Sequence, residues 1–263
     1  MSLRLALLVT GSPPEPVRAE YGDYSVIYTK WLRASLPQGS TATFTLDPYD
    51  VVHKMEYPSD AQLDGYYDGI LYTGSAASAY EDRDWINKLV AFSARVVNEK
   101  PHIKVIGICF GHQILARALG GSVVPNDGKW EVGITSLELT DMGKRLFGVE
   151  TINIQQMHRD HVPSIPSPFH LLGSTSVSLN QGMVRFAPGT APDQQSLKTA
   201  QVLTLQGHPE FIEGIVTGMV AVRAKTGVMS QELAADVQRR KDWRNDGTGV
   251  LGKAAWAVLG VKA

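Results

Sequence analysis

Four short apolar segments, each followed at once by small or polar residues, constrain the fold more than any other feature of the sequence. They are Leu5–Val9, Asp68–Tyr72, Lys104–Ile108 and Gln201–Leu205. Each lacks the alternation of apolar and polar residues that a half-exposed strand shows, and this is typical of strands covered on both faces. The segments therefore predict the strands of a buried, mostly parallel sheet.

Stretches in which apolar residues recur with helical spacing separate these segments. They cover residues 24–36, 84–97 and 113–119, and the last one stops at a pair of glycines. Strands that alternate with helices form a parallel sheet with helices on both faces. We therefore predict an α/β fold with a mostly parallel central sheet.

The region from about 122 to 168 has a different pattern. Partial alternation at 133–140 and 151–154, and again within 169–186, indicates a small antiparallel sheet attached to the main one. Helical patterns return at 230–243, with Ser230 as N-cap, and at 253–259. No linker composition interrupts the chain, so we expect a single domain over 1–263, with a core at about 3–222 and a helical C-terminal extension at about 223–263.

The charge balance excludes several classes of partner. Among 263 residues, 25 are Lys or Arg and 26 are Asp or Glu, which leaves a net charge of −1 and no excess to neutralise a nucleic acid. A content of 43% apolar and 19% charged residues excludes a largely disordered chain. We find no signal-peptide core and no apolar stretch of about 18 residues, so we expect a cytoplasmic protein without a membrane partner.

The single cysteine occupies a distinctive position. Cys109 lies between a predicted strand and a predicted helix, and glycines stand two residues before and after it. This is the pattern of a nucleophile elbow, in which the helix N-terminus stabilises a thiolate and the Phe110 N–H faces a developing oxyanion. The alternative is a buried structural cysteine. One cysteine allows neither an intramolecular disulfide nor a multi-cysteine zinc site.

A histidine and a glutamate follow the fourth apolar segment. His208 and Glu210 are two residues apart, so in an extended backbone their side chains point the same way. Ligands of open parallel sheets bind beyond the carboxyl ends of the strands, which places this pair near Cys109. The arrangement predicts a Cys-His-Glu triad, and the alternative is a surface histidine in a proline-containing turn.

The loop after the second segment supplies small residues at the same edge. Gly74 and Ser75 allow their backbone N–H groups to approach a substrate oxygen, although an ordinary Gly-Ser turn has the same composition. The stretch with His158, Asp160 and His161 is interpreted either as a polar loop or, alternatively, as a metal site. No phosphate-binding or dinucleotide motif is present, and we predict neither a metal nor another cofactor.

Two motifs together resemble a known family. Residues 107–113, Gly-Ile-Cys-Phe-Gly-His-Gln, and 206–210, Gln-Gly-His-Pro-Glu, resemble the class I (triad) glutamine amidotransferases over roughly residues 5–215. Residues 21–24, 72–82 and 84–86 are similar to the stand-alone branch, which includes GMP synthase-like amidotransferases and plant γ-glutamyl peptidases. The resemblance implies the flavodoxin-like fold of this family.

The resemblance also implies roles for matched positions. Cys109 would attack a γ-carbonyl and form a γ-glutamyl thioester, while His208, oriented by Glu210, would move the protons. Phe110 and the Gly74–Ser75 loop would form the oxyanion hole. In the pattern of the family this loop has a proline where this chain has Ala76.

The amino-acid end of the substrate has its own matched positions. Gln113 corresponds to a substrate-contacting glutamine. The stretch with His158, Arg159 and Asp160 corresponds to a family loop near that end, where Asp160 would face the α-ammonium group. Trp130, Tyr80 and His158 are expected around the pocket beside Cys109.

The resemblance leaves the leaving group open. The substrate, a small molecule, is either glutamine or a γ-glutamyl peptide such as a glutathione conjugate. One alternative is a glutaminase subunit that supplies ammonia to a separate synthase acting in trans. Another is a non-catalytic or reassigned member of the fold in a specialised biosynthetic pathway. The volume of the pocket beside Cys109 distinguishes a peptide from ammonia as the leaving group.

Overall fold

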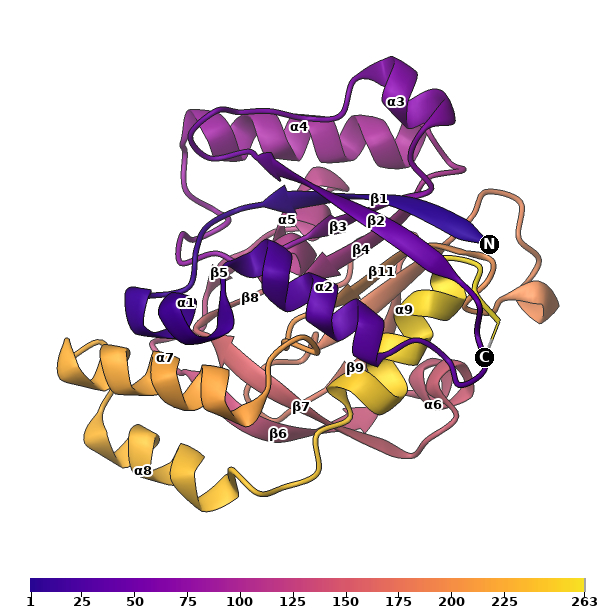
Figure 1. The fold of residues 1–263 in the computed structure, drawn as a ribbon. Helices are drawn as coiled ribbons and strands as arrows, with labels where there is room; N and C mark the ends of the chain where they lie inside the picture. The colour runs from indigo at the N-terminus through magenta and orange to yellow at the C-terminus, as the bar shows by residue number, and fades with distance from the viewer. Residues whose placement is uncertain (263) are drawn as a thin grey trace.

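The computed structural model describes residues 1–262, and its main feature is one nine-stranded sheet (Figure 1). The strand order is β2-β1-β3-β4-β11-β10-β9-β6-β7. The first five strands are parallel: β2 (Thr43–Asp50), β1 (Ser2–Val9), β3 (Gly69–Tyr72), β4 (Lys104–Ile108) and β11 (Ala200–Leu205). The other four pair in antiparallel fashion: β10 (Gly182–Phe186), β9 (His170–Ser174), β6 (Glu131–Leu139) and β7 (Thr151–His158).

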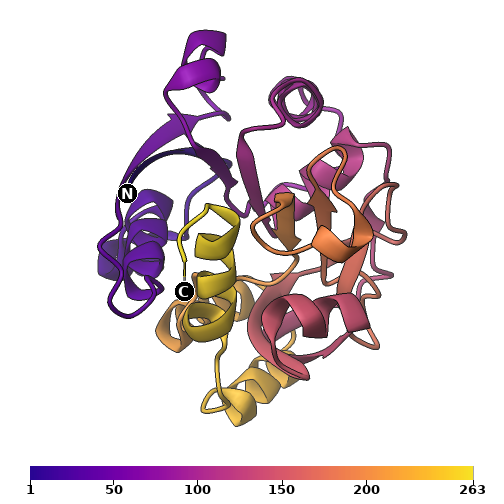
Figure 2. The same ribbon diagram turned by 90° about the vertical axis from the view of Figure 1, so that its right-hand side faces the viewer.

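Helices cover both faces of the parallel half. Leu5 and Leu7 of β1 pack into one hydrophobic cluster, while Ala6 and Leu8 pack into another on the opposite face. The first cluster includes α2 (Tyr24–Ala34), α7 (Glu213–Lys225) and α9 (Lys253–Val258); the second includes α3 (Asp60–Gly65), α4 (Asp84–Glu99) and α5 (Phe110–Ala118). Figure 2 shows α4 end-on and α9 on the other side of the strands. Burial on both faces explains why β1 is continuously apolar, and the α/β prediction is confirmed.

The predicted helices appear with shifted ends. The pattern at 113–119 belongs to α5, which starts at Phe110, and the pattern at 230–243 belongs to α8 (Gln231–Arg240). Ser230 caps α8 as predicted, because its hydroxyl accepts a hydrogen bond from the Leu233 N–H at 3.1 Å. A π-helical turn (Gly247–Gly252) precedes α9.

Several elements were not predicted. They are β2, α1 (Glu15–Tyr21), α3, α6 (Asp141–Phe147), α7 and the short η1 (Pro192–Gln194). β2 contains Pro48, which an edge strand tolerates. The helical signal of α7 is weakened by Gly214 and Gly218, where a β-carbon would collide with Tyr21 and Val17 of α1. These glycines let α1 and α7 pack closely, as Figure 1 shows.

The antiparallel region matches the predicted one. Residues 133–140 and 151–154 lie mainly in β6 and β7, and 169–186 contains β9 and β10. A separate two-stranded sheet joins β5 (Val124–Pro125) to β8 (Asp160–His161). Among the helices of residues 1–262, none has the length and apolar character needed to cross a membrane.

Candidate functional site

Cys109 lies at a sharp turn between β4 and α5. Its backbone has φ 52° and ψ −103°, a conformation that residues other than glycine rarely adopt. A β-carbon on Gly107 would lie 2.8 Å from the Gly111 carbonyl oxygen, and one on Gly111 would collide with Tyr72. The Cys109 N–H donates to the Leu205 carbonyl at 2.8 Å, which fastens the turn to β11. The glycines of the motif are therefore required by close backbone approach.

His208 follows β11 and is held on three sides. Its Nδ1 lies 2.8 Å from Oε1 of Glu210, and both side chains are buried. Its ring stacks on Phe211 with centroids 4.0 Å apart, and its backbone N–H donates to the Gln155 carbonyl at 2.7 Å. These contacts fix the plane of the imidazole and leave Nε2 free to face a second group.

Buried charge decides the protonation of His208. Burial by itself lowers the pKa of His208, but the negative charges of Glu210 and Cys109 outweigh it and raise that pKa to about 10. The second Glu210 oxygen has no hydrogen-bond partner among residues 1–262. Burial first, and then the Glu210 charge, raise the pKa of the neighbouring Tyr28. The Glu210 carboxylate therefore favours the protonated form of the His208 imidazole.

Gly74 stands between the thiol and the imidazole. A β-carbon there would lie 2.8 Å from His208 Cε1 and 3.6 Å from Cys109 Cβ, so any side chain would fill the space that the two share. The Thr10 hydroxyl lies 2.8 Å from the Gly74 carbonyl oxygen and holds the loop to the end of β1. In the described part of the chain, the N–H groups of Gly74 and Ser75 have no acceptor.

Hydrogen bonds connect the residues that were expected to contact the substrate. Gln113 donates from Nε2 to the Asp160 carbonyl at 3.0 Å, and the Asp160 carboxylate accepts from Ser78 at 2.6 Å. His158 lies between the Asp160 carbonyl, 3.0 Å from Nδ1, and the Glu131 carboxylate, 3.1 Å from Nε2. Nδ1 of His158 is therefore hydrogen-bonded, whereas Nε2 lies within ion-pair distance of Glu131 without a hydrogen bond. Residues 1–262 contain no group of three His, Cys, Asp or Glu side chains that could hold a metal ion.

Two cavities meet at this site. One, of about 270 Å³, is lined by Cys109, Phe110 and the side chains described above, and the other, of about 330 Å³, is lined by His208 and Phe211. Both share a wall made of Ser75, Ala76, Met157, Arg223 and Val228. Trp130 and His158 line the first cavity as expected. Tyr80 lines neither and is 41% exposed, so its expected place beside Cys109 is wrong.

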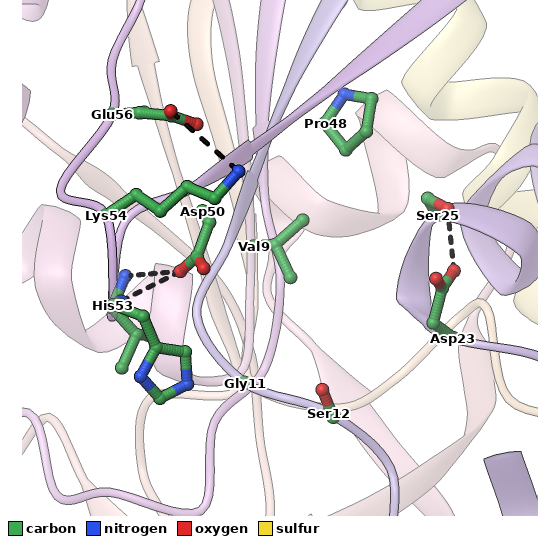
Figure 3. Close-up of a pocket in the computed structure, with 11 residues that line it drawn as sticks. Val9, Gly11, Ser12, Asp23, Ser25, Pro48, Asp50, His53, Lys54 and Glu56 are labelled. Carbon is green, nitrogen blue, oxygen red and sulfur yellow. Dashed lines mark hydrogen bonds and ion pairs between the residues drawn. The ribbon is translucent and has the colours of Figure 1, made fainter.

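A third hollow, of about 470 Å³, lies beyond the ends of β1 and β2 (Figure 3). Ser12 borders both this hollow and the His208 cavity. The charged side chains that line the third hollow interact with groups in their own loops. The Asp50 carboxylate accepts from the His53 N–H at 2.9 Å, and Lys54 pairs with Glu56 at 4.0 Å.

Two arginines border the cavity beside Cys109. Arg159, which the sequence predicted, and Arg223, which it did not, lie over the Trp130 ring at 5.7 Å and 5.2 Å from its centroid. Arg223 was missed because α7 was missed. The spacing of Ile215, Val216, Met219 and Val220, all buried, could have revealed the helix, but nothing in the sequence singles out its arginine.

Comparisons of the sequence with known proteins identify its family. Residues 40–218 match the family model described as glutamine amidotransferase class-I. The chain is 35% identical over 250 residues to a Schizosaccharomyces pombe protein named as glutamine amidotransferase-like, covering 92% of this chain and 93% of that one. It is 30% identical over 237 residues to gamma-glutamyl peptidase 5 of Arabidopsis thaliana, covering 88% and 85%.

A solved structure agrees at the level of the fold. A glutamine amidotransferase from Thermotoga maritima matches over 98% of both chains with a TM-score of 0.65 and 17% identity. Together these matches confirm the resemblance drawn from the two motifs. The chain belongs to the class-I glutamine amidotransferase family.

Proposed function

We propose that the chain is a cysteine hydrolase that cleaves γ-glutamyl amide bonds and releases a peptide or conjugate rather than ammonia. The cavity of about 330 Å³ beside His208 carries this proposal. It lies next to the group that would protonate the leaving amine. Ammonia is about the size of a water molecule, roughly 30 Å³, and needs no such space.

In the proposed acylation, the Cys109 thiolate attacks the γ-carbonyl carbon. The C–N bond breaks, and the departing nitrogen takes a proton from the His208 imidazolium. A γ-glutamyl thioester remains on Cys109. In the second step water attacks the thioester, His208 accepts the proton of that water, and the Cys109 sulfur leaves as glutamate is released.

The proposed oxyanion hole consists of backbone N–H groups. Phe110 contributes the first N–H of α5, which has no partner inside the helix. Gly74 and Ser75 contribute N–H groups that have no acceptor in the described part of the chain. Donors that are already oriented before the reaction stabilise the developing negative charge without further reorganisation.

The proposed site for the amino-acid end is the Cys109 cavity. The Asp160 carboxylate, held by Ser78, would accept a hydrogen bond from the α-ammonium group of the γ-glutamyl unit. The Gln113 side chain donates a hydrogen bond to the Asp160 carbonyl and holds that backbone in place. The acyl group would then lie in the smaller cavity and the leaving group in the cavity beside His208.

A substrate panel tests the proposal. Glutamate release is measured from a γ-glutamyl dipeptide, glutathione, a glutathione S-conjugate and glutamine, with wild type and Cys109→Ala. We expect the γ-glutamyl peptides to have a higher kcat/KM than glutamine and Cys109→Ala to be inactive, with its urea unfolding midpoint near that of wild type. Activity that persists in Cys109→Ala would contradict the mechanism. Preference for glutamine over every peptide would favour an ammonia-supplying subunit.

A further inference from the structure

Arg223 differs from the other half-buried arginines of the described chain. These arginines are Arg95, Arg117, Arg185, Arg223 and Arg240. Four of them donate hydrogen bonds from the side chain to protein oxygens, whereas the Arg223 guanidinium has neither a hydrogen bond nor an ion pair with any of residues 1–262. A partly buried guanidinium normally has an acceptor, because leaving its donors unpaired costs free energy. Because Arg223 lines both cavities, its donors remain available to a ligand there.

A second arginine lies close to Arg223. Burial lowers the pKa of Arg223, negative charge on Tyr24 or Cys109 raises it, and the charge of Arg159 lowers it. Arg159 and Arg223 both lie against Trp130, which fixes their positions through cation–π contacts. No carboxylate of the described chain pairs with either guanidinium. An incoming anion would therefore find both arginines at the Cys109 cavity and Arg223 at the His208 cavity.

The cavity beside His208 has a simple composition. Its walls include apolar side chains from α7 and neighbouring segments, among them Met157, Phe211, Met219 and Val222. Apart from the His208 imidazolium, Arg223 carries the one formal charge among the described residues that line it. This composition fits a leaving group with an apolar part and one anionic group.

We propose that Arg223 binds the carboxylate of the departing amino acid or peptide, so that the preferred substrates are γ-glutamyl amino acids and peptides with a free carboxylate beyond the scissile bond. The inference rests on the proposed function and adds the substrate class. A planar guanidinium matches a carboxylate through two parallel hydrogen bonds. In the Cys109 cavity Asp160 would face the α-ammonium group of the acyl unit, and Arg159, which lines this cavity alone, would face its α-carboxylate. Arg223 also lines the His208 cavity and is therefore positioned to receive the anion of the leaving group.

A matched pair of substrates tests this assignment. γ-Glutamyl-methionine and γ-glutamyl-methioninamide differ only in whether the departing residue ends in a carboxylate or a neutral amide. In wild type we expect kcat/KM to favour the acid by roughly tenfold to a hundredfold. In Arg223→Gln this ratio should fall close to one, and in Arg223→Lys part of it should remain. Arg185→Gln, a half-buried arginine of β10 outside both cavities, should keep the wild-type ratio.

Binding to inactive protein separates the two proposals. In Cys109→Ala, calorimetry should show tighter binding of the acid than of the amide, and adding Arg223→Gln should remove the difference. A ratio near one in wild type, or one that Arg223→Gln retains, overturns the inference while leaving γ-glutamyl hydrolysis intact. If wild type hydrolyses neither compound, the proposed function fails. The binding difference in Cys109→Ala then supports or overturns the role of Arg223 by itself.

Discussion

The backbone of Cys109 has a positive φ that its glycine neighbours make possible. At this scale the site depends on two features: space that only hydrogen can fill, at Gly74, Gly107 and Gly111, and charge enclosed away from water, at His208 and Glu210. The sequence predicted the elbow and the His208–Glu210 pair from spacing, because a strand-to-helix turn and an i, i+2 pair are local patterns. Burial and Phe211 stacking could not be predicted, since they depend on distant segments.

Gly111→Ala tests the space around the turn. The new β-carbon would collide with Tyr72 and lie 3.1 Å from the Tyr72 carbonyl oxygen, so we expect the free energy of unfolding to fall by about 1–3 kcal/mol. Urea unfolding measures this loss. Gly65→Ala is the control, because a β-carbon there meets nothing within 4 Å. Equal stability of the two variants would refute the packing argument.

The pH dependence of activity tests the enclosed charge. Because the pKa of His208 is raised to about 10, the imidazolium that protonates the leaving amine is lost only as the pH rises through that value. We therefore expect kcat/KM to fall on the alkaline side near pH 10. Glu210→Gln removes a charge that raises this pKa and should move the fall to lower pH by roughly one to three units.

A surface carboxyl provides the control for that profile. Glu232 is exposed on α8, so Glu232→Gln should keep the wild-type pH profile. An alkaline fall at the same pH in Glu210→Gln and wild type would show that Glu210 does not set the protonation of His208.

At the scale of elements, the site is built from the loops that follow β1, β3, β4 and β11, which meet because the strands are parallel neighbours. This juxtaposition followed from four apolar segments and a general rule about parallel sheets. Helix α7 was not predicted, because its glycines allow close packing against α1 and obscure its helical pattern. The part of the cavity wall that α7 contributes, including Arg223, therefore could not be predicted from local sequence patterns.

Thr10→Val tests how the loop after β3 is held. Valine keeps the shape of threonine but cannot donate to the Gly74 carbonyl oxygen, which the Thr10 hydroxyl contacts at 2.8 Å. A displaced loop would misplace the proposed oxyanion donors, so we expect kcat to fall by about tenfold or more, with KM less affected. Steady-state kinetics on a γ-glutamyl peptide measures both. Thr45→Val, on an exposed position of β2, should behave as wild type, and an unchanged kcat in Thr10→Val would count against the loop's role.

At the scale of the whole molecule, the antiparallel strands extend the sheet and carry the residues beside the Cys109 cavity. Glu131 of β6 lies 3.1 Å from His158 and accepts hydrogen bonds from Thr175 at 2.7 Å and Gln181 at 2.6 Å. These residues come from segments far apart in the sequence. No motif joins them, and only the completed sheet shows that the positions of His158 and Asp160 depend on a buried carboxylate.

Glu131→Gln tests that dependence. Burial raises the pKa of Glu131, but hydrogen bonds and the charge of His158 outweigh it, so that pKa lies below its ordinary value of 4.5. The stability that ionised Glu131 contributes is therefore present above pH 4.5 and lost as the pH falls below it. At neutral pH we expect Glu131→Gln to lower the free energy of unfolding by about 1–3 kcal/mol, and the difference from wild type to shrink in acid.

An exposed carboxyl on the same strand is the control. Glu138→Gln in β6 should leave urea unfolding close to wild type at both pH values. A Glu131→Gln variant as stable as wild type at neutral pH would show that the buried carboxylate does not hold this region together.

The central claim is that Cys109 carries the γ-glutamyl group during turnover. Its most direct test is mass spectrometry of the intact protein, quenched in acid during hydrolysis of a γ-glutamyl peptide, followed by peptide mapping. Because the sequence has one cysteine, a thiol label reports on this site alone. We predict a single γ-glutamyl adduct at Cys109 that blocks alkylation and is absent from Cys109→Ala. Turnover without any adduct, with Cys109 open to alkylation throughout, would contradict the account.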